Sequence, residues 1–101
     1  MAAGAPVVAW ATWPAASFAW TAGRPARHRS STAVTRSFCG RCGTPLTYRH
    51  DDHAEWIDVT VCSLDDPATH APTDHIWTED RLPWMTGLDA LPSHARTRTG
   101  R

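Results

Sequence analysis

The amino-acid sequence predicts a small, mostly β domain: an antiparallel sheet with few or no helices. Short runs rich in Val, Trp and Thr recur along the chain, separated by turn signals at intervals of about eight to twelve residues. Eight prolines and six glycines interrupt the 101 residues, which disfavours long helices. Six tryptophans supply the large apolar surfaces that the core of a single small domain requires.

The expected elements follow from this pattern in chain order. The runs with strand character are Ala5–Trp13, Ala16–Thr21, Thr32–Phe38, Pro45–Arg49, Glu55–Cys62 and His75–Thr78. Pro14 is expected to end the first strand, and Gly23 and Pro25 are expected to turn the chain after the second. Arg27–Ser31 is interpreted as a polar connector, and the run HDDH (His50–His53) as a solvated turn.

Glu55–Cys62 has the clearest strand pattern. Its residues alternate, so Ile57, Val59 and Val61 share one face, which we expect to point inward. Cys62 falls on the other parity, and we expect it to be a core or half-buried residue.

The last third of the chain has weaker signals. Ser63–Pro67 resembles a helix start, but Pro72 limits it to a short turn. Leu82–Met85 and Leu88–Leu91 are expected to close over the sheet. The predicted domain therefore spans residues 3–92, and residues 93–101, which lack an apolar anchor, are predicted to be a disordered tail.

The charges are unevenly distributed, although the formal net charge is zero. Residues 1–50 hold six arginines and no acidic residue, whereas residues 51–92 hold ten acidic residues and one arginine. We interpret the two halves as neutralising each other within one fold, which argues against a nucleic-acid partner.

No apolar run reaches the roughly 18 residues of a membrane span, so no membrane partner is predicted. Three cysteines cannot form a closed disulfide framework, and this predicts a cytoplasmic location.

Cys39 and Cys42 form the motif FCGRCG, whose spacing is typical of half of a metal site. Two thiolates on one tight turn, followed by a glycine that permits a positive φ, suit tetrahedral zinc. A thioredoxin-like redox pair is disfavoured, because Gly43-Thr44-Pro45 prevents the helix it needs. Two ordinary buried cysteines, or a set of four ligands completed by His50 and His53, remain as alternatives.

Four blocks of the sequence, in the same order, resemble the glutathione-dependent formaldehyde-activating (GFA) family, which includes the centromere protein V type. The blocks are GAPVVAWAT (Gly4–Thr12), RSFCGRCGTPLTYR (Arg36–Arg49), IDVTVCSLDDP (Ile57–Pro67) and HIWTEDRLPWMTGLDALP (His75–Pro92). Their order makes the resemblance specific, since a C-x-x-C-G alone occurs in many proteins.

The resemblance implies a tent-like, Mss4-like fold associated with zinc. It implies that Cys39 and Cys42 are two ligands of a structural zinc, and that a C-x-C motif nearer the family's N-terminus supplies the other two. The family holds a second, catalytic zinc through a cysteine cluster ahead of the segment that begins at Gly4. Neither motif has a counterpart in these 101 residues. We therefore expect an N-terminally truncated domain without catalytic residues, in which a second zinc is doubtful.

The function implied by the resemblance is that of a carbon–sulfur lyase or S-hydroxymethylglutathione synthase. Its substrates would be small thiol–aldehyde adducts such as S-hydroxymethylglutathione, formed from glutathione and formaldehyde. The isolated chain is expected to be inactive, so whether it is itself an enzyme stays open. One alternative is a non-enzymatic, zinc-ribbon-like module that binds nucleic acid or protein. Another is a homodimer in which each chain contributes Cys39 and Cys42 to one shared zinc.

Overall fold

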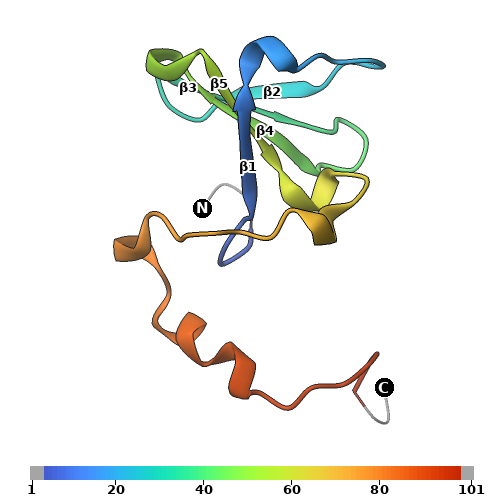
Figure 1. Cartoon of the computed structure of the whole chain (residues 1–101), viewed down its shortest axis with the longest axis vertical. Helices are drawn as coiled ribbons and strands as arrows, with labels where there is room; N and C mark the ends of the chain where they lie inside the picture. Colours follow the sequence, from blue (N-terminus) through green and yellow to red (C-terminus); the bar gives the residue numbers. More distant parts are fainter. Residues whose placement is uncertain (1–3, 99–101) are drawn as a thin grey trace.

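A computed structural model of the chain describes residues 4–98 and contains one five-stranded antiparallel sheet (Figure 1). The strands are β1 (Trp10–Pro14), β2 (Ala26–Arg29), β3 (Val34–Phe38), β4 (Pro45–His50) and β5 (Trp56–Thr60). The spatial order is β1-β5-β4-β3-β2, so β1 and β2 form the two edges. The predicted mostly β, antiparallel fold class is confirmed, and the architecture is consistent with a GFA-type, Mss4-like fold.

The central strand β5 shows why the sheet holds together. Ile57 and Val59 are buried, as is Val61 just after the strand, which confirms the predicted inward face. Val59 lies opposite Ala11 of β1 on one side and opposite Thr47 of β4 on the other. The core is shallow, since no side chain among the described residues is completely enclosed.

The first predicted strand is shorter than expected. It begins at Trp10, and it includes Pro14 rather than ending before it. Proline is tolerated there because β1 is an edge strand, where one row of backbone N–H groups has no partner.

The second predicted strand, Ala16–Thr21, is wrong. The short 3-10 helix η1 (Ala15–Ser17) occupies its start, and no strand follows before Ala26.

The connector predicted at Arg27–Ser31 is also wrong, because most of it belongs to β2. Arg27 pairs with Ser37 and His28 with Arg36, so the strand forms against β3 despite its polar sequence. Polar and charged residues are usual on edge strands, where they discourage pairing with other chains. The predicted turn at His50–His53 is confirmed, since η2 (Asp51–His53) joins β4 to β5.

Beyond β5 the described chain contains only short 3-10 helices and irregular segments. The helices are η3 (Val61–Ser63), η4 (Pro67–Thr69), η5 (Thr78–Asp80) and η6 (Pro83–Ala90). The strand predicted at His75–Thr78 is wrong, because its residues are exposed and Trp77 has a left-handed backbone, with φ 57°. An extended or sheet-paired strand cannot include that conformation.

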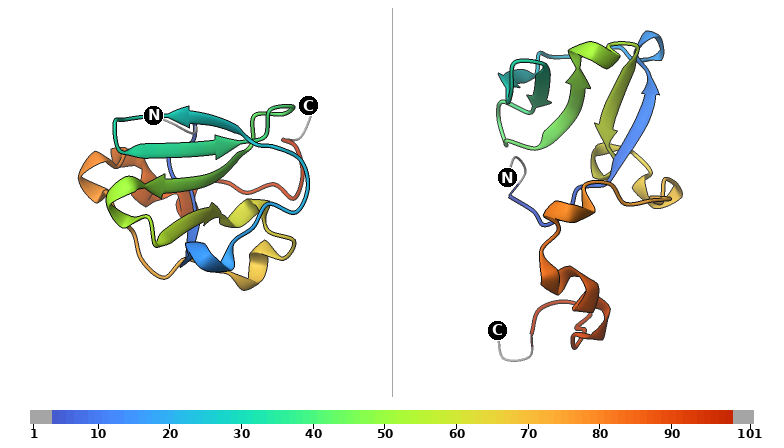
Figure 2. Two further views of the ribbon diagram at one scale, coloured as in Figure 1. Left: turned by 90° about the horizontal axis from the view of Figure 1, so that it is seen from above. Right: turned by 90° about the vertical axis from the view of Figure 1, so that its left-hand side faces the viewer.

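Residues 71–92, called the arm below, lead away from the sheet (Figures 1 and 2). The predicted closing segment over the sheet is therefore wrong: the elements that pack closely are neighbouring strands, together with η3 and η4. The Cα radius of gyration is 16.0 Å, against about 13 Å for a compact chain of 100 residues. Within residues 4–98, no helix combines the length and the apolar character needed to cross a membrane.

Candidate metal half-site

The turn between β3 and β4 places Cys39 and Cys42 side by side. The backbone N–H of Cys39 donates to the carbonyl of Thr44 at 2.9 Å, and the N–H of Gly43 donates to the carbonyl of Cys39 at 2.8 Å. These two hydrogen bonds close a tight loop at the end of the hairpin. Gly43 has φ +80°, and a Cβ there would meet no atom within 4 Å, so glycine is required by backbone conformation rather than by space.

The two thiols are accessible from solvent. Cys39 is half-buried and Cys42 is exposed, and both are free cysteines. A hydrogen bond of 3.0 Å joins Cys42 Sγ to Thr44 Oγ1. The Thr44 hydroxyl lowers the pKa of Cys42, with smaller contributions from the Thr44 backbone and the Cys39 side chain. Each stabilises the thiolate, which is the form that binds a metal ion.

The third cysteine lies apart from this pair. Cys62 is exposed, so the prediction of a core or half-buried residue is wrong. The strand alternation ends at Thr60, and the chain turns into η3, where Val61 takes the buried position and Cys62 faces solvent. The burial predicted from strand alternation is wrong here, because side chains in a 3-10 turn do not alternate between two faces every two residues.

The histidines do not complete the cysteine pair. The rings of His50 and His53 lie 5.6 Å apart at the far end of β4, and His50 Nδ1 accepts a hydrogen bond from the backbone N–H of Asp52. In the part of the chain that the structure describes, no three His, Cys, Asp or Glu side chains gather closely enough to hold a metal ion. The alternative with two cysteines and two histidines is therefore not formed.

The pair fits half of a structural zinc site and no more. Two adjacent thiols, one with a lowered pKa, on a glycine-containing turn are suitable donors for tetrahedral zinc. The remaining two donors are not found among residues 4–98. The residues present do not fit a separate catalytic zinc, and we derive no reaction step through one.

A second group of side chains was not identified from the sequence. Thr12, Asp58, Tyr48 and Arg36 follow one another across β1, β5, β4 and β3, each opposite the next. Thr12 Oγ1 donates to Asp58 Oδ1 at 2.5 Å, and the Arg36 guanidinium lies 4.9 Å from the centre of the Tyr48 ring. These contacts link adjacent strands on the face opposite Val59. Only the register of the sheet brings them together, so no local sequence signal marks them.

The chain is therefore a small antiparallel β protein with a paired-cysteine turn at one hairpin. Its residues 1–80 match the family described as glutathione-dependent formaldehyde-activating enzyme. The chain belongs to the GFA family. The match includes the five strands, the cysteine turn and η5, and it ends before η6. Comparison with curated proteins and with solved structures gives no significant match.

Proposed function

We propose that this chain is a zinc-stabilised GFA-type domain, in which Cys39 and Cys42 supply two of the four thiolate ligands of a structural zinc. The observation that carries the proposal is the cysteine turn. Its backbone is closed by two hydrogen bonds, Gly43 takes the required positive φ, and Thr44 favours the thiolate of Cys42. Thiolate pairs in this arrangement form one side of tetrahedral zinc sites.

The cysteine turn also suits a structural role better than a catalytic one. It lies at the tip of a hairpin, and neither the hollow beside η6 nor the hollow between β4 and β5 includes Cys39 or Cys42. A zinc ion there would cross-link the ends of β3 and β4 to whatever supplies its other ligands. A complete structural zinc site contributes on the order of 10–16 kcal/mol of binding free energy, against about 5–10 kcal/mol for the net stability of a domain this size.

The reaction class proposed for the domain is the family's chemistry on thiol–aldehyde adducts. In the synthetic direction the sulfur of glutathione bonds to the carbon of formaldehyde, and the thiol proton ends on the former carbonyl oxygen. The product is S-hydroxymethylglutathione, and the lyase direction breaks the same carbon–sulfur bond. Family membership supports this assignment. The residues of this chain that would contact the substrate are not assigned, and we propose that these 101 residues alone do not accelerate the reaction.

Metal analysis of the purified chain tests the zinc assignment. After saturation with zinc and removal of the excess, native mass spectrometry should show zinc on the wild-type chain and on Cys62→Ser. Zinc should be lost from Cys39→Ser and Cys42→Ser. The Cys62 variant is a matched control, because it removes an exposed thiol outside the turn.

Cobalt provides a readout that is independent of activity. Thiolate-to-cobalt absorption should appear with wild type and with Cys62→Ser, and fall when Cys39 or Cys42 is replaced. One metal ion per two chains would assign the remaining ligands to a second copy. Equal metal binding by all the variants would refute the role of the turn.

A further inference from the structure

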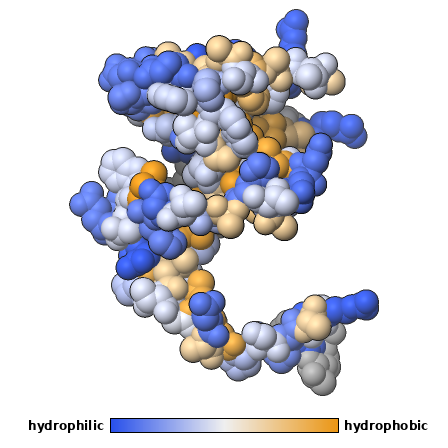
Figure 3. Space-filling view, in the orientation of Figure 1, coloured by the Kyte–Doolittle hydropathy of each residue, from blue (hydrophilic) through white to orange (hydrophobic). Residues whose placement is uncertain are grey.

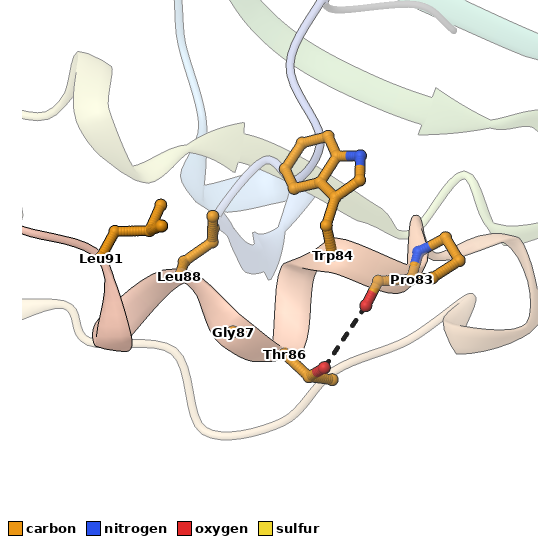
Figure 4. A pocket seen from close by; sticks show the side chains of 6 residues that line it. All are labelled: Pro83, Trp84, Thr86, Gly87, Leu88 and Leu91. Atoms are coloured by element: carbon orange, nitrogen blue, oxygen red, sulfur yellow. Dashed lines mark hydrogen bonds between the residues drawn. The ribbon is translucent and has the colours of Figure 1, made fainter.

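The arm exposes large apolar side chains that its own sheet does not cover. Ile76 and Trp77 are 74% and 72% exposed, and Trp84 is 55% exposed. Trp84, Leu88 and Leu91 project from the same side of η6, and the hollow beside them is lined only by residues of the segment 83–91 (Figure 4). Figure 3 shows apolar groups along the arm, between hydrophilic side chains. Exposed apolar surface of this size marks an interaction site.

Trp77 has the features of an anchor residue. It is the only non-glycine residue of the described chain with a positive φ, and its exposed indole precedes η5. A bulky side chain in the left-handed region costs free energy, so the conformation needs a compensating contact. Tryptophan is also among the residues that contribute most to the affinity of protein interfaces.

The charges indicate what the arm contacts. Four acidic residues and one arginine lie in the arm, whereas residues 24–49 hold six arginines and no acidic residue. Arg24, Arg27 and Arg41 form no ion pair with any residue in the range 4–98. An acidic, apolar arm is therefore complementary to the arginine-bearing strands of the same protein.

The sheet also has a receiving surface. A hollow between β4, η2 and β5 is lined by Tyr48, Arg49, His50, His53, Trp56 and Asp58. Trp56 is 48% exposed, and the hollow combines two aromatic side chains with the Arg49 guanidinium, two imidazoles and the Asp58 carboxylate. It adjoins η2, which lies at the top of the sheet in Figure 1, whereas η5, which Trp77 precedes, and η6 both lie below the sheet.

We propose that the protein forms a two-fold dimer by exchanging arms: the arm of each copy lies on the sheet of the other, with Trp77 in the hollow beside Trp56. Within one chain the sheet separates the hollow from the arm. The arm that fills the hollow therefore comes from the second copy and not from the same chain. A reciprocal contact closes the assembly at two copies and leaves no free arm.

The available area suits such a dimer. The exposed parts of Ile76, Trp77, Trp84, Leu88 and Leu91 amount to roughly 600 Å² per arm, taking the usual areas of large side chains. Two arms and the two surfaces they cover would then bury about 2,000 Å² even with incomplete contact. Stable specific interfaces bury about 1,200–2,000 Å² in total.

Analytical ultracentrifugation of the full chain, over a range of concentrations and with a metal chelator present, tests the proposal. The wild type should approach twice the monomer mass. Trp77→Ala and Trp56→Ala should each raise the dimer dissociation constant by about 30-fold or more. The matched control is Trp20→Ala, which truncates an exposed tryptophan outside both surfaces and should leave the dissociation constant unchanged. Circular dichroism verifies that each variant keeps its sheet.

Mixing the two deficient variants gives a sharper result. The arm of Trp56→Ala and the hollow of Trp77→Ala are both intact, so one of the two contacts can form. Native mass spectrometry should show more heterodimer in an equal mixture than random pairing of the two variants would give. A wild type that stays monomeric, or a mixture without excess heterodimer, would overturn the proposal. So would a dimer that the chelator abolishes and Trp77→Ala does not, which would assign dimerisation to Cys39 and Cys42.

Discussion

Truncation of Val59 tests whether the inward face of β5 is the true core. Val59 is 9% exposed and lies between Ala11 of β1 and Thr47 of β4, so its side chain joins three strands. Val59→Ala removes two buried methyl groups, each worth about 0.8 kcal/mol in transfer free energy. A small cavity term raises the total to about 2 kcal/mol, and the shallow core keeps that term low, because neighbouring side chains can relax.

The expected loss is a large fraction of the stability of a domain this small, about 5–10 kcal/mol. For a chain of this length the melting temperature should fall by roughly 8–16 °C. Thermal and urea unfolding followed by circular dichroism, at one fixed concentration and metal content, measure the change. Val7→Ala is the matched control: Val7 is 51% exposed, and its truncation should change stability by less than about 0.5 kcal/mol. Equal effects of the two substitutions would refute the assigned core.

Four further predictions concern the cysteine turn and the proposed activity. Thr44→Val removes the hydroxyl that lowers the pKa of Cys42, so alkylation of Cys42 should reach the same rate only at a higher pH. Peptide mass spectrometry measures the alkylation rate, and an unchanged pH profile would show that the hydroxyl has no such effect. The thiolate of Cys42 is favoured in the folded chain, so its contribution to stability is present at high pH and is lost as the pH falls through its lowered pKa. Gly43→Ala forces a side chain into the left-handed region, costs about 1–2 kcal/mol and should weaken zinc binding measured by competition with a chelating dye; unaltered competition would argue against the knuckle geometry. The isolated chain should form S-hydroxymethylglutathione no faster than the uncatalysed mixture, and a rate above that background, measured by NMR, would show that these residues suffice for catalysis.

The fold and the metal half-site were predictable where the signal is local. Alternation along β5 depends on a period of two residues, so Ile57 and Val59 could be assigned to the buried face from their spacing alone. The cysteine turn depends on neighbouring residues as well. Two cysteines three positions apart, a glycine and a following proline specify a tight hairpin end without reference to the rest of the chain.

Features that depend on distant partners could not be predicted in this way. Ala26–Arg29 is a strand only because β3 offers it an edge, and Ala16–Thr21 is not one although its apolar alternation is better. The exposure of Cys62 follows from the place where the chain leaves the sheet. The alignment of Thr12 with Asp58 follows from strand register.

The sequence by itself therefore determined the mostly β class, the inward face of β5, the paired-cysteine turn and the resemblance to the GFA family. The tertiary structure alone decided which polar segment becomes an edge strand and that no third ligand lies beside Cys39 and Cys42 within residues 4–98. It also decided that the apolar arm leaves its own sheet. The physical reason is that periodicity and turn chemistry act over a few residues, whereas pairing, burial and coordination depend on groups that only the folded chain brings together.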